Sequence, residues 1–218
     1  MSKIALNGES SGNAIFVIRA PASNTNQEFL LPDSSGTLLT DQDPILSAPI
    51  PSDRLPAGSV LQVEYVRYDD RISISAPQNT SGTDITELSV TITPIKADSL
   101  IYCQWFIQGE GTDHDIGFRV RVNGAEPSDG YNTDAGNQRW SFITSAQYDG
   151  NDNSTPKLET VNYFHEPGST NLVTYSPSVS SSSSNNRTLR LNRSDGNAGS
   201  DNYEVGVSWG VVYEIAQS

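Results

Sequence analysis

Apolar and polar residues alternate along several stretches of this chain, and helical periodicity is nearly absent. Alternation with a period of two is typical of a β-strand that has one buried face. The clearest cases are three sets of apolar residues with polar or charged neighbours: Leu61, Val63 and Tyr65; Leu88, Val90 and Ile92; and Phe118, Val120 and Val122. Each set predicts a strand with its apolar side chains in a core.

A longer alternation lies near the C-terminus and predicts one long final strand. Its apolar positions share one face: Tyr203, Val205, Val207, Trp209, Val211, Tyr213 and Ile215. The opposite face carries the small residues Gly206, Ser208 and Gly210, which allow close packing by a neighbouring strand or subunit. The stretch from Leu100 to Ile107 is apolar on both faces apart from Gln104. It is expected to be a central strand or a strand at a subunit contact.

Polar stretches separate these segments and predict long loops at residues 78–84, 125–138 and 176–186. The last of these contains the serine run from Ser180 to Ser184, a low-complexity segment typical of an exposed loop. Many short strands, frequent turn residues and the lack of helical patterns favour an all-β fold. We therefore expect a β-sandwich or jelly-roll domain.

The first part of the chain differs from the rest and predicts a separate unit. Residues 14–18 and 29–40 read as short β segments, and prolines are dense between residues 41 and 57. Proline opposes sheet pairing and favours an extended connector. The predicted organisation is a β segment at 1–40, a proline-rich connector at 41–57 and a β domain at 58–218. A unit as small as the first cannot bury both of its faces alone.

Composition and charge exclude several classes of protein. The chain has 218 residues, with 26 acidic against 13 basic groups and a formal net charge of −13. Such a field repels phosphate backbones, so we expect no nucleic-acid partner and no binding to acidic membranes. No signal peptide and no membrane-spanning apolar run is apparent. The single cysteine, Cys103, has apolar neighbours and is expected to be a buried thiol.

Residue types that carry catalysis or bind metals occur only in weak patterns. His114 stands between two aspartates, and residues 149–152 resemble part of a calcium loop without its spacing. A turn or surface loop is the favoured interpretation of both. Asp69 and Asp70 are expected to mark a turn rather than an acid pair, and His165 to be a paired or surface histidine. We therefore predict no catalytic residue, no metal site, no cofactor and no enzymatic activity.

Two segments resemble a known group of proteins. The sequences GNAIFVIRAP at 12–21, FLLPD at 29–33 and GTLLT at 36–40 are similar to a unit near the start of bacteriophage virion fibre proteins. The sequences FRVRVNG at 118–124 and GVVYEIAQ at 210–217 resemble the jelly-roll end domain of marine phage structural proteins. The resemblance implies a homotrimeric appendage, made in the host cytoplasm and located in the virion. Its N-terminal segment would join other virion proteins, and its jelly-roll domain would project.

This resemblance implies a structural role, for which there are two hypotheses. The first is a short tail fibre or spike that contributes to host adsorption. The second is a capsid decoration or head-fibre protein that stabilises the particle without binding a receptor. The chain has no extended shaft between its two parts, unlike long tail fibres, so both readings stay open. A glycan-degrading enzyme is disfavoured because no acid pair stands in a recognisable context.

Candidate contact residues follow from the same picture. Apolar side chains in the N-terminal segment are the expected trimer and attachment interface, because three copies bury surface that one copy exposes. They are Phe16, Ile18, Leu30 and Leu38. The loop at 127–138 is the hypothetical contact with a host surface glycan or protein, and Tyr131 and Trp140 flank the polar stretch at 132–139. Trp140 stands beside Phe142, so a core position is its alternative interpretation.

Overall fold

The computed structural model describes part of the chain in detail. The described residues are 51–78, 82–112, 115–129, 143–144, 156–182, 184–196 and 204–217. The chain divides into two units, residues 1–47 and 48–218, and the structure below is that of the second. The predicted boundaries at 40 and 57 stay predictions.

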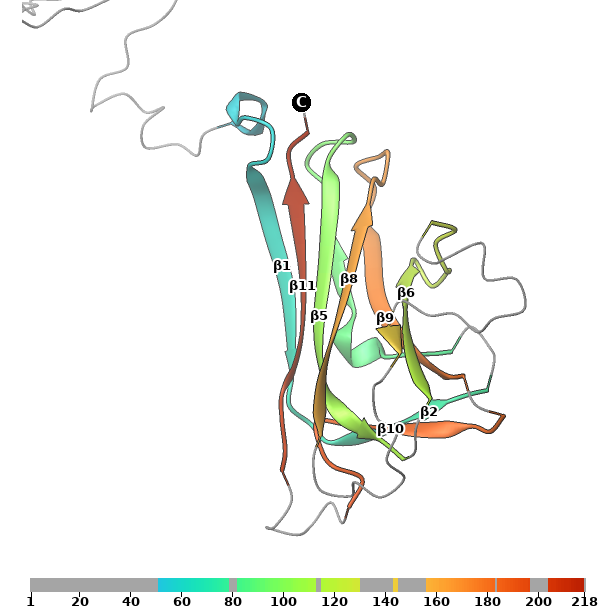
Figure 1. Cartoon of the computed structure of the whole chain (residues 1–218). Coiled ribbons are helices and arrows are strands. Elements are labelled where there is room, and N and C mark those ends of the chain that lie inside the picture. The colour runs from blue at the N-terminus through green and yellow to red at the C-terminus, as the bar shows by residue number, and fades with distance from the viewer. Residues whose placement is uncertain are drawn as a thin grey trace, which may run out of the picture. The chain divides into compact units, whose positions relative to one another are not determined.

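The strands of this unit form two antiparallel sheets (Figure 1). The larger, six-stranded sheet has the order β1-β11-β5-β10-β2, and β8 pairs with the other edge of β5. Its strands are β1 (Val60–Tyr68), β2 (Ile72–Ala76), β5 (Leu100–Gly111), β8 (Lys157–His165), β10 (Arg187–Leu191) and β11 (Ser208–Ile215). The five-stranded sheet has the order β3-β9-β6-β7, with β4 also paired to β9. Its strands are β3 (Thr83–Asp84), β4 (Val90–Ile92), β6 (Ile116–Val122), β7 (Ile143–Thr144) and β9 (Val173–Ser181).

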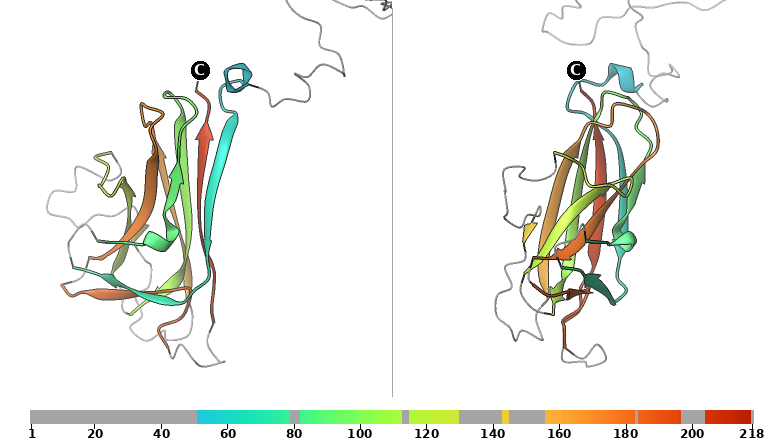
Figure 2. Two further views of the ribbon diagram at one scale, coloured as in Figure 1. Left: turned by 180° about the vertical axis from the view of Figure 1, so that it is seen from behind. Right: turned by 90° about the vertical axis from the view of Figure 1, so that its right-hand side faces the viewer.

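The two sheets pack against each other and enclose the core. Strand β4 lies against β1 and β11, β9 against β2 and β10, and β6 against β8. Figure 2 shows these layers from behind and from the side. The described residues contain two short 3₁₀ helices, η1 (Ser52–Arg54) and η2 (Thr86–Leu88), and no α-helix. The predicted all-β class is thus confirmed, and the two antiparallel sheets are consistent with a β-sandwich.

Trp105 on β5 is the largest side chain that the core buries completely. Its indole Nε1 donates a hydrogen bond to the carbonyl oxygen of Leu88, at 2.9 Å. The adjacent β11 makes room for the ring with Gly210, where a Cβ atom would lie 2.7 Å from Trp105 Cδ1. The small residues of the final strand therefore serve close packing by a neighbouring strand.

Glu214 on β11 is a completely buried carboxylate that joins β1, β11 and the segment after β4. It accepts hydrogen bonds from Gln62 Nε2 (2.5 Å), Ile95 N (2.8 Å), Lys96 N (3.0 Å) and Ser99 Oγ (2.6 Å). Burial raises the pKa of Glu214, but these hydrogen bonds outweigh burial, and the pKa lies below its usual value. The carboxylate is therefore held in its charged form by donors from two segments, β1 and the segment after β4.

Two of the three alternating sets have the predicted buried face. Leu88, Val90 and Ile92 are buried, with Leu88 in η2 and the other two on β4. Phe118 and Val120 are buried on β6, and Val122 packs against the core. The apolar stretch from Leu100 is the central strand β5, as expected.

The predicted loop at 176–186 is wrong over its first half, because residues 176–181 belong to β9. This strand is central in its sheet, with β6 on one side and β3 and β4 on the other. Proline has no backbone N–H to donate to a neighbouring strand. The backbone of Pro177 faces the gap between the end of β3 and the start of β4, where Ile85 N donates to Pro177 O. Serines can be buried in this strand because they are small. Since serine is not apolar, the pattern of apolar residues does not reveal the strand.

The burial predicted for the first alternating set is also wrong. Residues 60–68 do form β1, but Val63 and Tyr65 are exposed on it. The final strand is shorter than predicted, since β11 begins at Ser208, and its predicted apolar face turns outward with Trp209 exposed. The reason is that the five-stranded sheet covers the opposite side of β1 and β11.

We predict that Glu214→Gln destabilises the fold by about 3 kcal/mol at neutral pH, because hydrogen bonds to a charged acceptor are lost. The folded-state pKa is lowered, so the contribution of Glu214 is present above the usual value near 4.5 and is lost as pH falls through the folded-state pKa. Urea unfolding at about pH 7 and about pH 3, at one protein concentration, measures both effects. Glu64→Gln, at an exposed position on β1, is the control. Equal stability of the two variants would contradict the assignment.

Candidate functional site

The outward side of the six-stranded sheet carries rows of aromatic and aliphatic side chains. The register places residues of β1, β11, β5 and β8 side by side. The rows are Val63, Tyr213, Tyr102 and Phe164; then Tyr65, Val211, Gln104 and Asn162; then Arg67, Trp209, Phe106 and Thr160. We call their apolar members the outer aromatic face: Val63, Tyr65, Tyr102, Phe106, Phe164, Trp209, Val211 and Tyr213. Figure 1 shows the four strands next to one another.

Several rings on this face stack although water reaches them. Tyr102 stacks on Phe164 with 4.6 Å between ring centroids and on Tyr213 with 5.9 Å. Tyr65 is 69% exposed, Phe164 55% and Trp209 40%. A shallow depression of about 360 Å³ lies among these side chains on β1, β5 and β11. A continuous apolar patch of this kind marks an interaction surface.

Charge is nearly absent from these rows. Arg67 is the one charged residue among the row positions given above, at the margin of the face. Its guanidinium lies 5.6 Å from the centre of the Trp209 ring and donates to Asp69 at 2.6 Å. A protein with a net charge of −13 therefore presents a face without acidic side chains.

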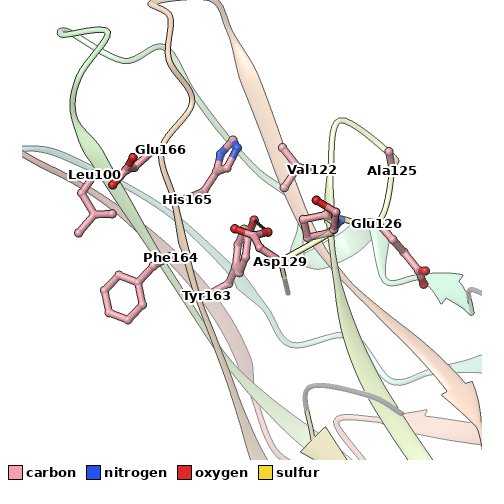
Figure 3. A pocket seen from close by; sticks show the side chains of 11 residues that line it. Leu100, Val122, Ala125, Glu126, Asp129, Tyr163, Phe164, His165 and Glu166 are labelled. Atoms are coloured by element: carbon pink, nitrogen blue, oxygen red, sulfur yellow. Dashed lines mark hydrogen bonds between the residues drawn. The ribbon is translucent and has the colours of Figure 1, made fainter. Parts of the chain in front are cut away.

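A groove of about 750 Å³ opens between the end of β8 and the turn after β6. Asn123 and Gly124 have φ angles of 51° and 78°, as in a tight Asn-Gly turn, and reverse the chain after β6. Figure 3 shows Tyr163, His165 and Asp129 directed toward one another, whereas Phe164 projects to the other side of β8.

Hydrogen bonds within the protein account for the polar groups of this groove. Tyr163 donates to Asp129 Oδ1 at 3.0 Å, and His165 Nδ1 lies 2.7 Å from the Tyr175 hydroxyl. Burial lowers the pKa of His165, and burial raises the pKa of Tyr175, so both groups are uncharged at neutral pH. Glu126 is ion-paired with Arg119 at 2.8 Å. His165 is thus a paired histidine, as expected.

All six of the predicted contact residues lie outside the described residues. These are Phe16, Ile18, Leu30 and Leu38 of the N-terminal segment, and Tyr131 and Trp140 of the predicted contact loop. His114 and the residues 149–152 also lie outside them. These predicted sites therefore stay predictions, and the outer aromatic face is a candidate that the sequence prediction missed.

Two further findings concern the described residues alone. They contain no group of three or more His, Cys, Asp or Glu side chains that could hold a metal ion. Among them there is also no helix long and apolar enough to cross a membrane. Asp69 and Asp70 lie between β1 and β2, where Asp69 accepts the bond from Arg67.

No protein-family model matches the chain, and no curated protein matches it.

We predict that Cys103 does not react with iodoacetamide in the folded protein. The thiol is completely buried on β5, and burial raises its pKa well above the usual value, so little thiolate forms. Mass spectrometry after short labelling should show no adduct in buffer and full labelling in concentrated urea. Rapid labelling of the folded protein would contradict the buried position.

Proposed function

We propose that this chain is a structural protein of a bacteriophage virion, a short tail fibre or spike that contributes to host adsorption. It assembles as a homotrimer with a jelly-roll head and joins the particle through its N-terminal segment. It works by attachment and performs no catalysis.

Two observations on the sequence support this proposal. The segments at 12–21, 29–33 and 36–40 resemble the attachment unit of phage fibre proteins. The segments at 118–124 and 210–217, which resemble a phage jelly-roll domain, correspond to β6 and β11. These strands belong to different sheets of an all-β domain, an arrangement that is compatible with a jelly-roll.

The observation that carries the proposal is the outer aromatic face. The five-stranded sheet leaves this side of the larger sheet uncovered. A strongly acidic chain repels a second copy of itself wherever acidic surfaces meet, so a face without acidic side chains is where copies can come together. This argument favours contact between identical chains.

Covering this face removes exposed aromatic area from water, which favours assembly. An aromatic side chain buries 150–250 Å², so the open parts of Tyr65, Phe164 and Trp209 amount to roughly 300 Å². At about 25 cal/mol per Å², removing this area from water contributes about 7 kcal/mol before the entropy of association is subtracted. Closed rings of identical subunits bury such faces in every copy.

We predict that Tyr65→Asp and Phe164→Asp each break the assembly, because an acid would face an apolar neighbour. Light scattering after gel filtration should give three times the chain mass of 23.6 kDa for the parent protein and a lower mass for the variants. Leu172→Asp is the matched control, since Leu172 is 62% exposed and lies outside the rows of the outer aromatic face. A monomeric parent protein, or equal dissociation of the control, would overturn the proposed contact.

The location of the protein tests its role. Intact virions labelled with an antibody to the C-terminal domain should show the label at the tail in electron micrographs. Label on the capsid would instead support a decoration or head-fibre protein. Virions without label would overturn the proposal of a virion protein.

A further inference from the structure

Arginine side chains gather on β10 and just after it, next to the paired strand β2, at one end of the six-stranded sheet. The register pairs Arg190 with Ser73, and Arg193 follows β10 directly. Figure 1 shows β2 and β10 at the opposite end of the domain from η1 and the C-terminus, and the views in Figure 2 agree. The chain enters the domain beside η1, so these arginines lie at its far end.

Two guanidinium groups meet at one serine hydroxyl in this cluster. Arg190 Nη1 donates to Ser73 Oγ at 2.7 Å, and Arg193 Nη2 donates to the same oxygen at 2.9 Å. The two nitrogens are therefore no more than about 5.6 Å apart. Like charges repel at this distance. A hydroxyl has two acceptor positions and one donor, so the proton of Ser73 stays available to a ligand.

The acidic groups around the cluster neutralise it only in part. Arg190 Nε donates to Asp195 Oδ1 at 2.8 Å, and Asp195 N donates to the buried Glu110. Arg193 donates to the carbonyl oxygen of Ser194 at 3.1 Å, and no carboxylate pairs with it among the described residues. Burial lowers the pKa of Arg193, the charges of Arg190 and Arg71 lower it further, and the negative charge of Asp195 acts in the opposite direction. Arg193 is thus a positioned cation near Asp195 that forms no direct ion pair in the described part of the chain.

We propose that Arg190, Arg193 and Ser73 form a binding site for the acidic group of a sugar, a carboxylate or a phosphate. Guanidinium groups bind these planar or tetrahedral anions through paired N–H donors. The bound anion would offset the repulsion between the two arginines. Serine and backbone contacts hold both side chains in place before the ligand arrives, which lowers the entropy cost of binding.

The net charge of the protein limits which acidic ligands can bind at the arginine site. At −13 the whole protein repels dense polyanions such as nucleic acids, whose charges extend far beyond one small site. A glycan with an isolated acidic group meets only the local field of the cluster. This inference rests on the proposed function, since acidic sugars on a host surface would be the target of an adsorption fibre, and the position at the far end of the domain suits such a contact.

The test uses the full chain and three sugars in saturation-transfer NMR and calorimetry. Methyl galacturonide carries a carboxylate, glucose 1-phosphate a phosphate, and methyl galactoside no charge. We expect at least one acidic sugar to bind and the neutral sugar not to bind. Binding of only one acidic sugar identifies the group that the site recognises. Arg193→Gln should weaken this binding about tenfold or more, because a hydrogen bond between charged groups is lost.

Two further variants distinguish the effect of removing an arginine charge from the effect of how Arg190 and Arg193 are positioned. Ser73→Ala keeps both arginines but removes the oxygen that holds them, and it should weaken binding several-fold. Arg54→Gln, at an exposed arginine of η1, is the control and should leave binding unchanged. Thermal unfolding confirms that each variant is folded.

The outcomes that overturn the site are distinct from those that overturn the proposed function. Failure of both acidic sugars to bind, or unchanged binding by Arg193→Gln, refutes the anion site even when trimer mass and virion label are as expected. A monomeric protein without virion label refutes the proposed function, whatever the sugars do.

Discussion

A β-sheet has two faces, and the second sheet of this domain covers only one face of the first. The five-stranded sheet packs on the side where Trp105 and Glu214 lie, and these residues join β5 and β11 to the segments around β4. Glycine at 210 leaves room for the indole, because a Cβ atom there would lie 2.7 Å from Trp105 Cδ1. Every apolar side chain that alternates with this inner set must then point outward. The outer aromatic face is thus the geometric consequence of a well-packed interior.

The charged side chains of the six-stranded sheet also differ between its covered inner side and its uncovered outer side. Its inner side holds the completely buried carboxylate of Glu214, which accepts hydrogen bonds from four groups, and its outer side is free of acids along the aromatic rows. Positive charge appears at the far end, where Arg190 and Arg193 meet at Ser73. A chain with twice as many acidic as basic groups would not concentrate arginines there by composition alone. Binding of an anion gives a physical reason for this concentration.

The pattern of the sequence predicts which residues form strands better than which face they bury. Alternation correctly indicates β1, β4, β6 and β11, because side-chain period follows from backbone geometry, and a continuous apolar stretch indicates β5. It does not say which face a second sheet will cover, so Val63 and Tyr65 are exposed against expectation. Strand β9 was missed because Ser176, Ser178 and Ser180 carry no hydrophobic signal although all are buried. The arginine cluster joins β2 to the end of β10, which are far apart in sequence, and local patterns cannot show such a pairing.

The outer aromatic face and the arginine cluster reinforce each other if both proposals hold. Identical subunits in a closed ring with one rotation axis present the same end of each domain in the same direction. Covering the outer aromatic face would therefore place three arginine clusters together at the far end of the assembly. A single site for one acidic group binds weakly, but linked sites convert the later contacts into intramolecular ones, and avidity can exceed the affinity of one site by 10²–10⁴. Weak recognition by each head is then compatible with firm adsorption by the trimer.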